Sequence, residues 1–279
     1  MGEDMDDLWR PIRSDHSIEL ASIILFFNGQ FPTLTAQKLR EAAVDLKDEA
    51  GFQRDQLHTE LEIDAASGQT RERQFGIALL DEAGLTAAEV SAGMFQQVLS
   101  IEENSIGFRS SKYRSYTEFK TRFRQLTDAL LPLVSNVMTL ARIRFEYQDK
   151  YVWTGERGVD IPLATLIRAN SPYIAPHIYK EPAVWHSHTG MVLPAKENGV
   201  NSVLQVHLQT GNFQRVPPQQ AHFGLSLMSA REDRLNPEDT AVSERAYSQL
   251  DAVLDGMHDD LISAIREVLS DDMLSKIGL

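Results

Sequence analysis

The chain has 279 residues, of which 42% are hydrophobic and 24% charged, a composition typical of a folded globular protein. It contains no cysteine, which excludes disulfides, thiolate nucleophiles and cysteine-ligated metal sites. The formal net charge of −13 repels phosphate backbones on average, so nucleic-acid binding would need a local basic patch.

Residues 1–16 are acidic and lack the apolar stretch of a secretory signal, so we expect a loose leader there. No apolar run reaches the roughly 20 residues of a membrane span. We therefore expect a cytoplasmic protein with no membrane partner.

The most apolar stretch, SIELASIILFF at 17–27, has Ile and Leu at both alternating positions, which predicts a central strand covered on both faces. TLTAQKLREAAVDLKDEAG at 33–51 predicts a helix, with Thr33 or Thr35 as N-cap. Short strand-like segments with turn residues between them predict a meander over 57–110.

Residues 115–138 predict a long helix, capped by Ser115 or Thr117 and kinked at Pro132. Its apolar residues follow a helical spacing and form one stripe: Tyr116, Phe119, Phe123, Leu126 and Leu130. The segment 141–153 predicts a strand with aromatic and aliphatic residues on one face and charged residues on the other.

The second half of the chain predicts a short helix at 160–170 and strands at 182–193, 202–209 and 221–229. Its end is helical over about 35 residues, by its apolar periodicity. The stripe of this last helix is Tyr247, Leu250, Leu254, Met257, Leu261, Ile265 and Val268.

These elements predict an α+β protein of two tightly packed halves. The first half, 17–154, has the element order of a ferredoxin-like split βαβ sandwich with an antiparallel sheet. The second half, 155–279, has strands followed by a long C-terminal helix. No sequence repeat is visible, and the order of elements leaves open that the second half echoes the first.

Four histidines are candidate metal ligands on predicted strands. His186 and His188 in WHSHTG share one strand face, and His207 and His222 also alternate with apolar neighbours. If the strands adjoin, three imidazoles could leave the open position of a catalytic zinc. A solvated polar face of a sheet explains the same pattern, and the sequence favours it because no supporting carboxylate lies near His207 or His222.

Asp251, Asp255 and His258 share one side of the C-terminal helix, where they could form an acid–base or metal cluster. We favour a solvated helix edge, with the histidine hydrogen-bonded locally.

The segment 108–124 is the one basic stretch of this acidic chain, opposed only by Glu118 and interleaved with tyrosines. Its cationic residues are Arg109, Lys112, Arg114, Lys120, Arg122 and Arg124. This segment could contact phosphates, a protein partner or a second copy of the chain, or pair internally with the acidic C-terminal helix. Phosphate-binding, dinucleotide-binding, nucleophile-elbow and kinase motifs are absent from the sequence.

Four segments resemble a sporadically distributed, uncharacterised family of bacterial proteins of similar length. They are IELASIILFF, IGFRSSKYRSYTEFKTRF, ARIRFEYQDKYVW, and LDAVLDGMHDDLISAIREVLSDDM, which keeps a helix histidine. The resemblance covers about 17 to 279, with Glu146 and Ile265 as departures, and it implies no catalytic residues. The patchy distribution of such genes suggests accessory proteins of defence or toxin–antitoxin loci.

The sequence therefore favours a non-enzymatic interaction or regulatory module without a cofactor. We expect a protein partner or a homodimer, contacted through 109–124 and the C-terminal helix. Two alternatives stay open: a metal-dependent hydrolase or nuclease using the histidines, and a nucleic-acid-binding regulator using the basic segment.

Overall fold

The computed structural model describes residues 8–13, 16–63, 70–155, 161–180, 184–194, 200–213, 222–236 and 238–279. Part of the predicted leader, 1–7 and 14–15, lies outside the described residues. So do the first two residues of the strand predicted at 182–193.

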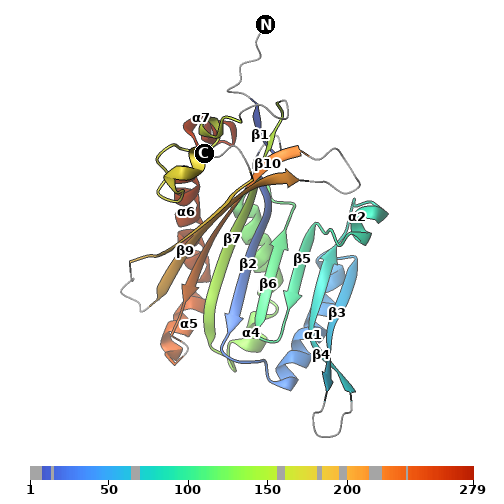
Figure 1. Cartoon of the computed structure of the whole chain (residues 1–279). Helices are drawn as coiled ribbons and strands as arrows, with labels where there is room; N and C mark the ends of the chain where they lie inside the picture. The colour runs from blue at the N-terminus through green and yellow to red at the C-terminus, as the bar shows by residue number, and fades with distance from the viewer. Residues whose placement is uncertain are drawn as a thin grey trace.

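One antiparallel sheet of ten strands runs through the described chain, in the order β3-β4-β5-β6-β2-β7-β10-β9-β8, with β1 paired to β7 (Figure 1). The strands are β1 (Trp9–Pro11), β2 (Ile18–Phe27), β3 (Arg54–Ile63), β4 (Thr70–Asp81), β5 (Gln97–Ile101), β6 (Ser105–Ser110), β7 (Leu140–Trp153), β8 (His186–Val192), β9 (Asn201–Phe213) and β10 (His222–Arg234).

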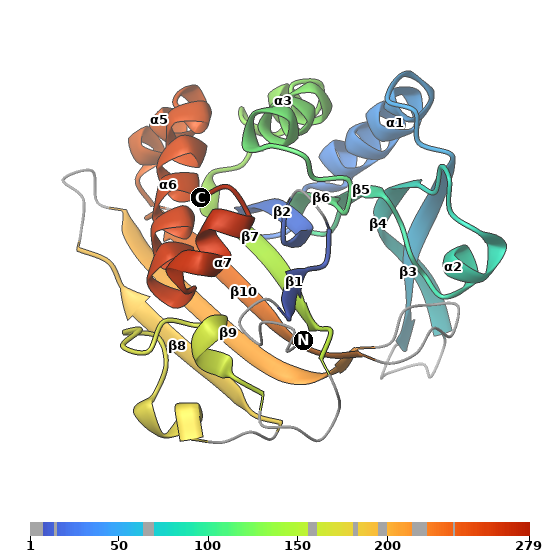
Figure 2. The ribbon, with the colours of Figure 1, turned by 90° about the horizontal axis from the view of Figure 1, so that it is seen from above.

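The long helices all lie on one side of this sheet, and the sheet arches away from them toward its two edges (Figure 2). The helices are α1 (Thr33–Glu49), α2 (Ala87–Ser91), α3 (Tyr116–Thr127), α4 (Leu131–Val134), α5 (Thr240–Ser248), α6 (Leu250–Val268) and α7 (Asp271–Lys276), with short 3-10 turns η2 (Leu163–Thr165) and η3 (Pro176–Lys180). Of the helices described, none has the length and apolarity of a membrane span.

The α+β class and the large antiparallel sheet agree with the sequence-based prediction. The finer prediction of a ferredoxin-like half is not confirmed. In a split βαβ unit one strand separates the two strands that the helix joins. Here β4, β5 and β6 lie between β2 and β3, the strands that α1 connects.

The two halves of the sheet follow a similar path. β2 is followed by a crossover and a meander whose last strand, β6, returns beside β2, and then by α3. β7 is likewise followed by a crossover and a meander whose last strand, β10, returns beside β7, and then by helices. The two similar paths thus start at β2 and at β7, which pair at the centre of the sheet, so the second path begins before residue 155, where the predicted second half starts.

The two longest predicted helices are each divided in the structure. The predicted helix at 115–138 begins at the Ser115 cap, whose hydroxyl accepts from the Glu118 amide, but it ends at Thr127. Pro132 lies in the first turn of the separate helix α4, where a missing amide donor costs little. The C-terminal helix is divided at Gln249 and again at Leu269, which has extended backbone geometry.

The core lies between the helices and the sheet. On β7, Ile143, Phe145 and Tyr147 are buried under the helices, while Arg142, Arg144 and Glu146 lie on the other face and are partly exposed. The apolar stripes of α3 and α6 complete this core, as their sequence spacing predicts.

Candidate functional site

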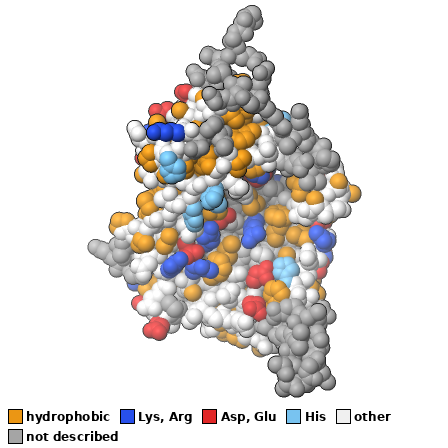
Figure 3. Space-filling view, viewed as in Figure 1, with side chains coloured by type: hydrophobic (Ala, Val, Ile, Leu, Met, Phe, Trp, Pro, Cys, Tyr) orange, Lys and Arg blue, Asp and Glu red, His pale blue; other side chains and the backbone are white. Residues whose placement is uncertain are grey.

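The face of the sheet opposite the long helices is concave. Figure 3 shows this face, with basic and hydrophobic side chains gathered over its middle. Over the central strands β2, β7 and β10, no helix of the described chain covers it (Figures 1 and 2). We refer to the outward residues of these three strands as the concave face.

Ion pairs cross the concave face between neighbouring strands. Glu232 of β10 is almost fully buried there, and its carboxylate accepts from Arg234 at 2.7 Å. It also lies 3.3 Å from a guanidinium nitrogen of Arg142 and 3.7 Å from one of Arg144. Arg144 in turn donates to Glu146 at 2.8 Å. Three arginines thus surround one buried carboxylate, so positive charge dominates this part of the face.

Apolar side chains lie beside this network. Leu20, Ile24 and Phe26 of β2 point to the concave face and are partly exposed, and Val152 of β7 and Met228 of β10 share this face. The Arg142 guanidinium lies over the Phe26 ring, 3.8 Å from its centroid, a cation–π contact. The concave face therefore offers apolar contact area and fixed positive charge together.

The structure brings together some of the four candidate histidines. His188 and His207 are cross-strand partners with ring centroids 5.5 Å apart, and His186 follows on the same face of β8. Burial, and then the neighbouring histidines, lower the pKa of His207. His222 pairs with Phe213 near the other end of β9 and is not part of this group. Among the described residues, no three His, Asp or Glu side chains are grouped to hold a metal ion.

The basic segment is divided between several surroundings. Arg109 is exposed on the open side of the sheet. Lys112, Lys120 and Arg124 pair with acidic residues: Lys112 with Asp81 at 2.8 Å, Lys120 with Asp255 at 2.6 Å, and Arg124 with Asp128 at 2.9 Å. Arg122 donates to the Ala50 carbonyl. Most of this segment therefore has partners inside the molecule. Only Lys120, and Arg124 through Asp251 at 3.5 Å, pair with the C-terminal helix as the sequence left open.

The helix histidine has partners that sequence spacing does not reveal. His258 stacks on Tyr116, with centroids 4.0 Å apart and planes 9° apart, and Nδ1 shares a hydrogen bond of 3.0 Å with the Tyr147 hydroxyl. Asp255 accepts from the Lys120 ammonium and from the Tyr116 hydroxyl, and these two bonds lower its pKa. Asp255 and His258, which we expected at a solvated helix edge, therefore join α6 to α3 and β7.

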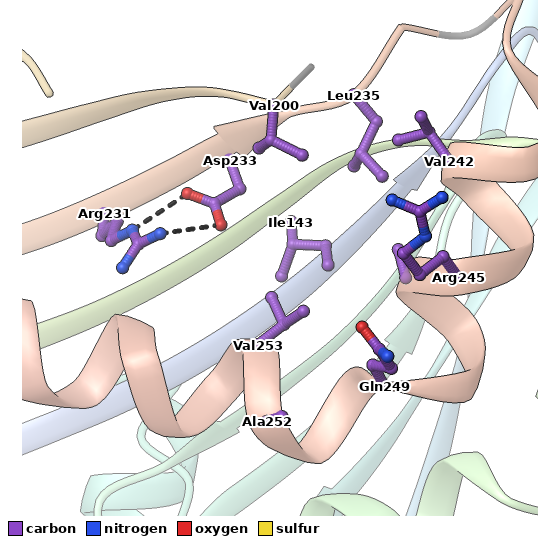
Figure 4. Close-up of a pocket in the computed structure, with 11 residues that line it drawn as sticks. Ile143, Val200, Arg231, Asp233, Leu235, Val242, Arg245, Gln249, Ala252 and Val253 are labelled. Carbon is purple, nitrogen blue, oxygen red and sulfur yellow. Dashed lines mark hydrogen bonds and ion pairs between the residues drawn. The ribbon is translucent and has the colours of Figure 1, made fainter. Parts of the chain in front are cut away.

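A pocket of about 210 Å³ lies between β10 and helices α5 and α6 (Figure 4). Arg231, buried at one side of it, donates twice to Asp233 at 2.9 Å, and also to the Gly256 carbonyl and to Asp260. Each nitrogen of this guanidinium has a protein partner. We therefore assign Arg231 to holding α6 on the sheet rather than to binding a ligand.

Searches of protein-family models and of curated proteins find no match to this chain.

Proposed function

We propose that this protein is a non-enzymatic interaction module that binds a protein partner across its concave face. One observation carries the proposal: β2 is apolar on both faces, but the described chain covers only one of them fully. Ile23 and Leu25 are fully buried under the helices, whereas Leu20, Ile24 and Phe26 face outward over the open centre of the sheet.

An antiparallel sheet that faces water normally alternates apolar and polar residues. β7 follows this rule, and β2, its neighbour, does not. Apolar area that is rimmed by polar side chains and left open is typical of a surface that another molecule covers. This supports a partner seated over β2 and β7.

The charge of the face favours one kind of partner. On the concave face, four cationic side chains outnumber three carboxylates, Arg142, Arg144, Lys150 and Arg234 against Glu19, Glu146 and Glu232, and Arg109 of the adjoining strand β6 adds a fifth cation. The protein as a whole carries a net charge of −13. We therefore expect a protein segment that presents apolar side chains flanked by carboxylates. In a defence-type locus, as the sequence resemblance suggests, this segment would belong to a neighbouring gene product.

The proposal is tested by placing a photo-crosslinking amino acid at position 24 in cells that carry the gene. The matched control is position 38, an exposed lysine on α1, on the helix side of the molecule. We expect a crosslink from position 24 to one protein, which an added Arg144→Glu substitution abolishes. Position 38 should give no crosslink to that protein.

Other outcomes at position 24 would overturn the proposal. A crosslink to nucleic acid would make the face a nucleic-acid interface. A crosslink only to a second copy of the chain would make it a dimer interface, which light scattering would then detect. No crosslink at all would leave a solvated face without a partner.

A further inference from the structure

A larger pocket lies on the helix side of the sheet. It has a volume of about 730 Å³ and is lined by the segment 16–18, the loop 113–116, helix α6 and the C-terminal residues 277–279. This volume is within the range of small-molecule sites. Neither the concave face nor the histidine pair contributes to it.

The inner wall of this pocket carries a buried carboxyl group. Asp149 is 1% exposed, and its Oδ1 accepts from the Ser17 hydroxyl at 2.6 Å. Its Oδ2 is buried without a hydrogen-bond partner in the described residues. Burial raises the pKa of Asp149 to about 7. A buried acceptor without a partner carries a free-energy cost that a ligand N–H group would remove.

One side wall is aromatic. His258 lies between Tyr116, on which it stacks, and Tyr147, to which it is hydrogen-bonded. Tyr113 lies 3.4 Å from Tyr147, hydroxyl to hydroxyl, which extends the chain of polar groups. Burial lowers the pKa of His258 and outweighs the neighbouring carboxylates of Asp259 and Asp255. The wall is therefore rigid and mainly uncharged, and Ile18, Ile262 and Ile277 add apolar surface.

The outer part of the pocket is basic on one side. Arg114 is exposed and has no ion pair within the described chain. It also lines an adjoining hollow of about 400 Å³ together with Arg13 and Lys112, where Glu118 is the one carboxylate among the lining residues. Arg266 and Asp259 of α6 also line the pocket. An anionic group fits beside Arg114.

We propose that this pocket binds a small organic anion that places an N–H donor against Asp149 and its anionic group beside Arg114. Two sources share this chemistry. A nucleoside monophosphate offers base N–H groups and a phosphate, and a short peptide offers an ammonium and a carboxylate. The volume and the aromatic wall suit the first, because a base also provides a flat apolar surface.

The test is calorimetric titration of the full chain with guanosine monophosphate, and separately with glycyl-leucine. We expect one of the two to bind. Asp149→Asn should weaken binding about tenfold, the effect of losing one buried hydrogen bond, and Arg114→Gln should weaken it about fivefold. Guanosine, which lacks the phosphate, should bind more weakly than guanosine monophosphate, and Arg114→Gln should not weaken its binding further.

Arg40→Gln is the matched control, since Arg40 lies on α1 and α3 stands between α1 and α6, the helix that lines the pocket (Figure 2). It should bind like the wild type. Arg114→Gln changes an exposed side chain and therefore tests the pocket even if Asp149→Asn fails to fold. The proposal is overturned if neither compound binds at millimolar concentration. Loss of binding in Arg114→Gln but not in Asp149→Asn would also overturn it, because simple charge attraction would then explain the result.

Discussion

On β7, consecutive residues face two different environments. Phe145 is fully buried under the helices and stacks at 6.0 Å from Phe119 of α3, whereas Arg144 lies on the concave face in a network of ion pairs. On its helix side β7 carries mainly apolar and aromatic residues, and its polar residue there, Asp149, is buried. The concave side is open and rich in charge. The same strands thus support stability on one face and leave the other for recognition.

This difference has a physical basis in the cost of moving charge out of water. Removing one partner of a buried ion pair leaves an uncompensated charge, whereas an exposed pair is screened and contributes little. Substitutions on the two faces should therefore differ in size even where the residue types match.

The largest effect is expected at Arg231. Arg231→Ala removes the partner of Asp233, which is 5% exposed, and should lower the free energy of unfolding by about 3–5 kcal/mol. Arg144→Ala on the concave face should cost about 1 kcal/mol or less, because Arg142 and Arg234 still pair with the buried Glu232 carboxylate. Urea denaturation of both variants measures the difference, and equal losses would contradict the assignment of stability to the helix side.

The pH dependence of stability tests whether Asp149 is a buried carboxyl group on the helix side without a cationic partner in the described chain. Its folded pKa of about 7 lies above the ordinary value of 3.8, so the folded state keeps a proton that the unfolded state releases. Asp149 therefore lowers stability as pH rises from about 4 to 7, by at most roughly 4 kcal/mol. Asp149→Asn should lack this loss and be more stable than the wild type at pH 8. A difference between the two proteins that does not change with pH would disprove this account.

Ile23 and Ile24 provide the closest comparison, because they are neighbours on β2 with opposite faces. Ile23→Ala should cost about 3 kcal/mol, since its side chain is fully buried in the core. Ile24→Ala should cost about 1 kcal/mol or less, since its side chain is partly exposed. If Ile24→Ala is as destabilising as Ile23→Ala, the concave face is a second core rather than a recognition surface.

The smallest effect is expected for Lys150 and Glu19, which pair at 2.6 Å on the open side of the sheet. A double-mutant cycle with Lys150→Met and Glu19→Gln should give a coupling energy below about 1 kcal/mol, and smaller still at high salt. A larger coupling that resists salt would show that this side is less exposed to water than we infer.

Local sequence signals predicted much of the fold. The period of the α3 and α6 stripes and the two-residue alternation on β7 depend only on neighbours along the chain, and the structure confirms both. The breaks at Asp128 and Gln249 were missed because a helical stripe can continue through a short turn. The order of strands was also missed, since β2 takes β6 and β7 as neighbours, far along the chain.

The candidate sites were harder to predict, because their residues also come from segments far apart along the chain. Tyr147 and His258 meet across 111 residues of sequence. Each lies beside an apolar stripe, so sequence alone assigns Tyr147 to the core and His258 to a helix edge. By sequence, Asp149 is one more polar residue in a strand, and only the structure shows that it is buried with no cation paired to it in the described part of the chain. The basic segment was visible as a charge reversal, but its internal partners come from four other elements or turns.

The position of β2 in the sheet also affects how the chain folds. Ile23 pairs with Phe145, so the most apolar strand of the protein is completed only by a segment about 120 residues later. At ordinary rates of synthesis that segment follows on the order of ten seconds after β2. During that time the IILFF stretch of the nascent chain has only α1 and the early meander to shield it, and contacts of such long range form slowly. This chain should therefore depend on chaperones during synthesis more than its final stability would suggest.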